Sequence, residues 1–258
     1  MDFSVFQRRF QEYVRTFSEP DGSCPFPVRM KIGHTDDVCR ITRELIAADG
    51  SFSARGQDVF LLAALFHDIS RFEQYRRFGT FRDDLSFDHG DRSAEILGSG
   101  GFLGGIAPED ARTVTDAVRY HNKLRLPPEH ATPAAKMIRD ADKLAILELL
   151  IGFFNGPAEI RDSEAAKLGL PDSPGFSSAV LRSVLDGEPV RHRELTCVND
   201  FKLVLFGWAN DINFPVSAAY ALKKEYYPAI RKLLPEGAEI DELLKRTLVL
   251  LAAKGKVS

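Results

Sequence analysis

Six histidine and aspartate residues have the chemistry and the surroundings of metal ligands. They are His34, the adjacent pair His67 and Asp68, His89, His121 and Asp142. The pair directly follows an apolar run, residues 60–66, that belongs inside a folded protein. Burying an ionised carboxylate beside an imidazole is costly unless something compensates, and a divalent cation supplies that compensation. One such pair alone could equally be a helix-terminal aspartate beside a satisfied core histidine, whereas the six residues together predict a metal site.

Helical periodicity turns most of these residues inward. His34 lies on the same helical face as Val38 and Leu45, and His121 and Asp142 each share a stripe with apolar residues of their own segments. We therefore expect all three side chains to point into a core rather than into solvent.

The environment of His89 is more ambiguous. It follows Ser86 and Asp88, either of which could cap a helix that begins there. His89 is thus either a ligand, a capping residue or a residue that supports a ligand from behind.

The elements that position these residues are helices. Phe6, Phe10 and Val14 form a stripe at helical spacing, which predicts an N-terminal helix that packs on the core. Two late helices are expected at about residues 216–234 and 239–253. We expect an all-α fold with a metal-binding domain over residues 1–154, while residues 155–258 form a helical cap or extension on the same core.

Composition fits a water-soluble enzyme. The chain has 258 residues, of which 44% are hydrophobic and 28% charged, so it can bury a substantial core. A net charge of -3 argues against extended nucleic-acid binding. No apolar run has the length of a membrane span and no secretory signal is recognisable, so a cytoplasmic location is expected. Three scattered cysteines do not predict a disulfide framework.

The order His, His-Asp, His, His, Asp resembles the HD-domain superfamily of metal-dependent phosphohydrolases. The resemblance extends over residues 29–150 and implies an HD-type helical bundle with additional C-terminal helices. It implies that one ion is held by four residues: His34, His67, Asp68 and Asp142. His89 and His121 would complete a second site, and Asp68 would be the bridging ligand and the catalytic residue. Asp140 competes with Asp142 for its role.

Residues 67–81 also resemble an uncharacterised bacterial branch of that superfamily. Ser70 stands where a small residue, often glycine, is expected after His-Asp-Ile. The departure is mild, and the branch does not reveal a substrate.

The donor types indicate which metals fit. Several imidazoles with two carboxylates and no thiolate favour Mn or Fe, and Mg, Co, Ni or Zn are alternatives. One or two such ions would activate a hydroxide that attacks phosphorus. Hydrolysis of a phosphoester or phosphoanhydride then needs no nucleophilic side chain, and a nucleotide or related phosphorylated metabolite is the expected substrate.

Basic residues near the predicted ligands could bind the phosphate. Arg71 and Arg76 follow the His-Asp pair, and Lys143 follows Asp142. A guanidinium offers paired donors that match phosphate oxygens. The arginines could instead cover an exposed helix face or pair with nearby acidic residues, and Lys143 could merely neutralise a buried carboxylate.

Two other kinds of function use the same ligands. The resemblance extends to di-iron oxygenases of the inositol-oxygenase type, in which O2 chemistry replaces hydrolysis. A non-catalytic module that holds a nucleotide through a metal is the third alternative. Aromatic residues of the C-terminal region could in addition form a homodimer interface.

Overall fold

The computed structural model describes residues 1–19, 21–157, 167 and 169–256. No strand occurs among these residues, which confirms the predicted all-α fold. No helix in this part of the chain is long and apolar enough to cross a membrane.

The described chain divides into two compact units, residues 1–142 and 143–258. Helix α7 (Pro133–Asn155) passes from the first unit into the second. The predicted domain boundary after residue 154 stays a prediction.

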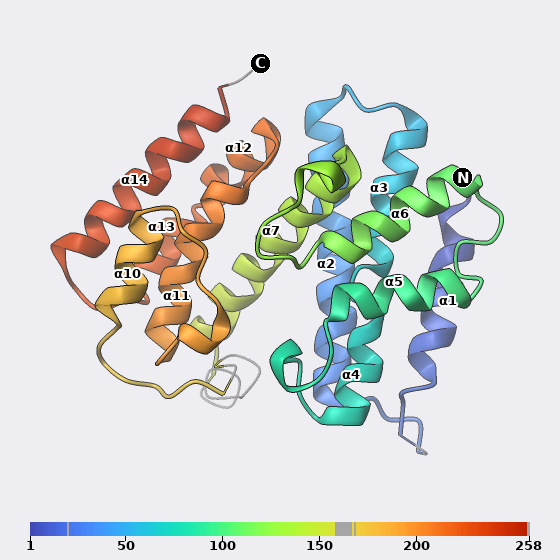
Figure 1. The fold of residues 1–258 in the computed structure, drawn as a ribbon, viewed down its shortest axis with the longest axis horizontal. Coiled ribbons are helices and arrows are strands. Elements are labelled where there is room, and N and C mark those ends of the chain that lie inside the picture. Colours follow the sequence, from blue (N-terminus) through green and yellow to red (C-terminus); the bar gives the residue numbers. More distant parts are fainter. Residues whose placement is uncertain (20, 158–166, 168, 257–258) are drawn as a thin grey trace. The chain divides into compact units, whose positions relative to one another are not determined.

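Six helices precede α7 in the first unit, shown in blue to green in Figure 1. They are α1 (Phe3–Arg15), α2 (Phe26–Asp49), α3 (Ala54–Phe66), α4 (Ser70–Phe78), α5 (His89–Ser99) and α6 (Pro108–Tyr120). Short 3-10 turns occur at η1 (Asp83–Leu85) and η2 (Pro128–His130).

Helix α3 is the centre of this unit and packs against α1, α2 and α6. Its last residues, 62–66, are all buried, so it is apolar around most of its circumference. Phe10 of α1 contacts the rings of Phe66 and Phe72, as the N-terminal stripe predicts. The apolar run before His67 is therefore buried on several sides at once.

Helix ends determine where the candidate ligands lie. Ser53 caps the start of α3 by accepting a hydrogen bond from the Gly56 backbone N–H. His67 directly follows the last residue of α3, and His121 follows the last residue of α6. Asp88 caps α5 by accepting from the Asp91 N–H at 3.0 Å, so His89 is the first residue of that helix.

In the second unit, five further helices follow α7 among the residues that the structure describes. They are α10 (Ser178–Leu185), α11 (Val198–Gly207), α12 (Pro215–Lys223), α13 (Tyr226–Arg231) and α14 (Ala238–Lys254), with 3-10 turns η3 (His192–Glu194) and η4 (Trp208–Asp211). Helix α14 packs against α11, α12 and α13. Within this unit, the Lys254 ammonium donates to the backbone carbonyls of Ala209, Asn210 and Ile212.

One predicted helix is wrong in its extent. The expected helix over residues 216–234 is divided into α12 and α13 by a break at Glu225, whose φ is 53°. Pro228 explains the break because it has no N–H to donate to the Lys224 carbonyl, and its ring would clash with that carbonyl in a continuous helix. In the first turn of a new helix, where Pro228 lies, neither problem arises.

Candidate metal centre

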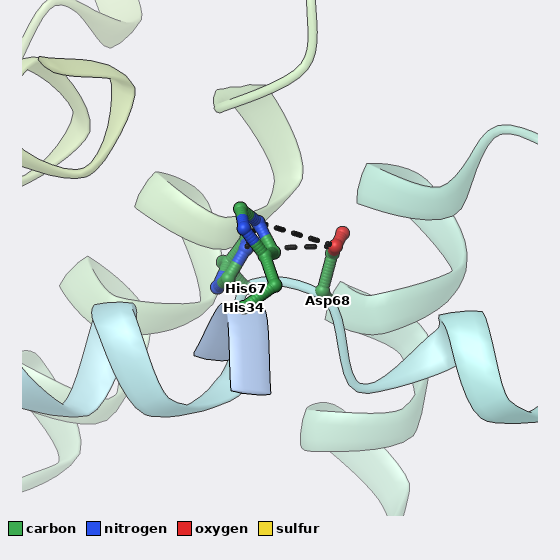
Figure 2. A group of neighbouring side chains, drawn as sticks. All are labelled: His34, His67 and Asp68. Atoms are coloured by element: carbon green, nitrogen blue, oxygen red, sulfur yellow. Dashed lines mark hydrogen bonds and ion pairs between the residues drawn. The ribbon is translucent and has the colours of Figure 1, made fainter. Parts of the chain in front are cut away.

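The first unit brings the six predicted residues together from five different segments. His34 lies in the middle of α2, with Val38, Ile41 and Leu45 of the same face all buried. His67 and Asp68 lie in the short turn between α3 and α4, where both face His34 (Figure 2).

Four of the residues form what we call the first ligand set: His34, His67, Asp68 and Asp142. Nε2 of His34 lies 3.0 Å from Oδ1 of Asp142 and 3.3 Å from Nε2 of His67. Oδ2 of Asp68 is 3.6 Å from the His67 Nε2 and 3.9 Å from the His34 Nε2. The donor atoms thus converge on a small volume.

The second ligand set consists of Asp68, His89 and His121. Nε2 of His89 lies 3.2 Å from Nε2 of His121, and these two nitrogens are 3.5 and 3.8 Å from Oδ1 of Asp68. Asp68 therefore belongs to both sets, with one carboxylate oxygen on each side. Two groups of three buried residues have donor atoms close enough together to hold an ion. They are His34, His67 and Asp68 from the first set, and Asp68, His89 and His121, which make up the second set.

Hydrogen bonds on the far side of the rings support binding of a cation. Nδ1 of His67 lies 2.8 Å from the Ala64 carbonyl, and Nδ1 of His121 lies 2.7 Å from the Val118 carbonyl. A carbonyl can only accept, so Nδ1 carries the proton and the Nε2 lone pair faces the cluster. Lone pairs that face each other repel unless a cation lies between them, so these donors fit a metal.

The electrostatics of Asp68 favour its ionised form. Burial alone would raise the pKa of this carboxyl, but Lys31 at 2.8 Å and Arg71 at 3.3 Å outweigh burial and hold the pKa well below its usual value. The Asp142 carboxyl behaves similarly: burial opposes ionisation, and the imidazole of His34 lowers its pKa. Both aspartates are therefore anionic at neutral pH, the form that a metal ligand needs.

Two of the buried histidines, His67 and His89, are neutral at pH 7. Burial lowers the pKa of His67 to about 3, although the neighbouring aspartates oppose this effect. Burial, reinforced by the Arg71 charge, lowers the pKa of His89 to about 4. Neutral imidazole is the form that ligates metals, so protons do not compete for these two nitrogens near pH 7.

The part of the chain that contains both ligand sets is similar to a known protein family. Residues 31–147 match a family model described as HD domain. The chain carries an HD domain. All six residues of the two ligand sets lie inside the matched range, and the superfamily is one of metal-dependent hydrolases. No significant match was found among curated proteins or solved structures.

The HD domain also contains contacts that sequence reasoning missed. One is the contact of Lys31 with Asp68. Lys31 lies one helical turn before His34 in α2, so its position on the same helix face could have been predicted from the sequence. Asp83 accepts a hydrogen bond from Nδ1 of His89 at 2.6 Å. It lies in the short turn η1, where no periodicity could connect it with His89.

The three predicted phosphate-binding residues differ in their positions. Arg71 lies against both Asp68 and His89, with Nη2 3.3 Å from the His89 Nε2. Arg76 donates to the Thr16 carbonyl at 2.7 Å and lies over the Phe17 ring, outside both ligand sets. Lys143 forms an ion pair with Asp211 of the second unit at 2.7 Å. Arg71 therefore contacts two residues of the ligand sets, Asp68 and His89.

Proposed function

We propose that this protein is a metal-dependent phosphohydrolase that cleaves a phosphoester or phosphoanhydride bond of a small phosphorylated molecule, such as a nucleotide. The observation that carries the proposal is the shared carboxylate of Asp68, which lies between two groups of imidazole nitrogens within an HD domain. Arg71 and Lys31 add positive charge beside it.

In this proposal the first ligand set holds one divalent ion and the second ligand set holds another, with Asp68 common to both. The mixture of imidazole and carboxylate donors favours Mn or Fe over a purely oxygen-seeking ion. When bound, such ions lower the pKa of water towards neutrality and neutralise charge on an attacked phosphoryl group.

The protein's own residues would bind and orient the substrate. The Arg71 and Lys31 side chains are only 12% and 13% exposed, so water screens their charges less than it would at the surface. A phosphate oxygen beside Asp68 would meet donors from both residues, and the guanidinium can donate in pairs. The phosphate would thus be held next to the ligand sets by Arg71 and Lys31.

The charge balance of the site indicates what would attract an anionic substrate. Lys31 and Arg71 carry two positive charges, and the carboxylates of Asp68, Asp83 and Asp142 oppose them. In this proposal the surplus positive charge that a phosphate needs would therefore come from the divalent ions that the ligand sets hold.

The test begins with metal analysis of protein purified without oxygen, followed by phosphate-release assays. The assays use p-nitrophenyl phosphate, bis-p-nitrophenyl phosphate and a panel of nucleotides, each with Mn, Fe, Co or Mg. We expect bound divalent metal and metal-dependent release of phosphate or nitrophenol that is lost in Asp68→Asn. Two Fe per chain with oxygen consumption and no hydrolysis of any substrate would contradict the proposal.

The proposal places the enzyme in the cytoplasm with a phosphorylated metabolite as its partner. Cell fractionation with an antibody against the chain would test the location. Recovery in the membrane fraction after a high-salt wash would contradict it.

A further inference from the structure

Asp83 uses its two carboxylate oxygens to hold His89 of the second ligand set and the neighbouring Arg71. Oδ1 accepts from Nη1 of Arg71 at 2.9 Å and from the Gln74 amide at 3.0 Å. Oδ2 accepts from Nδ1 of His89 at 2.6 Å and from the Asn122 amide at 3.3 Å. A single side chain thus links a candidate ligand to the arginine beside it.

The contact with His89 determines which ring nitrogen carries the proton. An ionised carboxylate can only accept, so Nδ1 of His89 is the protonated nitrogen and Nε2 keeps its lone pair for an ion. A carboxylate behind a ligating imidazole also raises the basicity of that imidazole. His67 and His121 receive the same orientation from backbone carbonyls, so His89 differs from them because a side chain orients it.

The contact with Arg71 fixes the position of its guanidinium. Nη1 is held by Asp83, by the Gln74 side chain at 2.7 Å and by the Phe81 carbonyl at 2.6 Å. This leaves Nε directed at Oδ1 of Asp68 and Nη2 directed at Nε2 of His89. Arg71 therefore lies against two of the three donor atoms of the second ligand set.

We infer that Asp83 is a positioning residue that sets the affinity of the second ligand set for its ion without affecting the first. It does so by fixing the tautomer of His89. The tether of Arg71 is a separate contact, which positions the proposed phosphate-binding residue. The inference rests on the proposed function insofar as both require two ions, but it is measured by ion binding and not by turnover.

The isosteric variant Asp83→Asn gives a sharp test because its amide has only one acceptor oxygen. Donors face both oxygen positions: Arg71 and Gln74 at Oδ1, and the Asn122 amide and the His89 backbone N–H at Oδ2. The guanidinium is charged and makes the strongest of these hydrogen bonds, so it draws the amide oxygen to the Oδ1 position and the NH2 group faces His89. The NH2 group can only donate, so it would move the ring proton to Nε2 and remove the lone pair that binds the ion. Asp83→Ala leaves both tautomers open and should be less harmful.

The experiment titrates Mn²⁺ into metal-free protein, follows free Mn²⁺ by electron paramagnetic resonance and counts bound ions by mass spectrometry. The wild type should bind two ions per chain. In Asp83→Asn the first ion should bind unchanged and the second about 10–100-fold more weakly, the range found for groups that support metal ligands. Asp83→Ala should lie between Asp83→Asn and the wild type.

The neighbouring Asp84 provides the matched control. It is an exposed aspartate in the same turn and pairs with Arg82 at 2.7 Å, outside both ligand sets. Asp84→Asn should bind both ions as the wild type does. Thermal unfolding followed by circular dichroism must show that each variant is folded at the temperature of the titration.

Three results would overturn the inference: normal binding of both ions in Asp83→Asn, equal weakening of both ions, or a wild type that binds fewer than two. Failure of the proposed function gives a different result. A wild type that binds two ions, loses the second in Asp83→Asn and hydrolyses no phosphorylated compound would support the role of Asp83 and contradict the phosphohydrolase.

Discussion

The two ligand sets share Asp68 but are held in place by different means. His34 and Asp142 of the first set lie within the long helices α2 and α7, and His67 is oriented by the backbone carbonyl of Ala64. In the second set, His121 is likewise oriented by a backbone carbonyl, but His89 begins a helix and is oriented by Asp83, a loop side chain.

This difference has a consequence for sensitivity to mutation. Backbone contacts inside a helix persist whichever side chains surround them, whereas a carboxylate in a short turn can be removed by one substitution. We therefore expect the first set to be the more robust of the two, and the second to be the one that single changes weaken or tune.

The largest effect is expected at Asp68, the residue that the two ligand sets share. Asp68→Ala removes an oxygen from each set, so affinity for both ions should fall by more than about 100-fold and hydrolysis should be abolished. Metal analysis and phosphate-release assays would measure this, with circular dichroism to confirm folding. Full metal content in a folded Asp68→Ala protein would refute the assignment of both sets.

A change at Gly90 should separate the two sets. A Cβ at this position would lie 2.6 Å from the Arg119 carbonyl of α6, so α5 and α6 must move apart and carry His89 and His121 with them. We expect Gly90→Ala to lose the second ion, keep the first and lower the free energy of unfolding by about 1–3 kcal/mol.

Gly98 is the control for Gly90 because it lies in the same helix and a Cβ there meets nothing within 4 Å. Alanine has the higher helix propensity, so Gly98→Ala should leave ion binding unchanged and should not destabilise the protein. Urea unfolding and Mn²⁺ titration of both variants make the comparison. Equal behaviour of the two would show that the approach of α5 to α6 does not matter for the second set.

Arg71 should affect substrate more than metal. Arg71→Ala removes a charged donor beside both sets but no ligand, so KM should rise by roughly 10–100-fold, which corresponds to about 1.5–3 kcal/mol, while metal content stays the same. Arg77→Ala is the control, since that arginine is 58% exposed and pairs with Glu73. Steady-state kinetics on the best substrate decides, and an unchanged KM would remove Arg71 from the phosphate site.

The smallest effect is the pH dependence of stability. One histidine of each ligand set, His67 and His89, causes it. The pKa is lowered from 6.5 to about 3 for His67 and to about 4 for His89 by burial. Below about pH 6.5 these two histidines bind protons in the unfolded chain but not in the folded metal-free protein. The free energy of unfolding should therefore decrease as the pH falls from about 6.5 to the folded pKa values. Above about pH 6.5 it should not depend on these two groups.

Urea unfolding of the metal-free protein at pH 7, 6 and 5 would measure this dependence. His67→Gln and His89→Gln should each reduce the decline, because each removes one of the two titrating groups. A decline in the wild type that neither variant reduces would show that other groups cause it.

Much of the site was predictable from the sequence. His34 was recognisable from the apolar residues that share its helical face, and the His67-Asp68 pair from the buried run before it. The break in the predicted helix at residues 224–225 was missed because the apolar pattern continues on both sides of it, although Pro228 was a signal that a continuous helix is unfavourable there.

By itself the sequence determined the all-α class, the inward direction of the candidate ligands and the donor chemistry of imidazoles and carboxylates, because these follow from residue type and from periodicity along one helix. That Asp68 is shared was implied by the family resemblance alone, and the tertiary structure shows that it faces both groups of imidazoles. Only the tertiary structure decided that Asp83 supports His89. Those contacts join a turn to a loop or to a distant helix, and loop residues have no periodicity from which their direction can be inferred. The packing of α3 against α2 and α6 is what brings them within reach of one another.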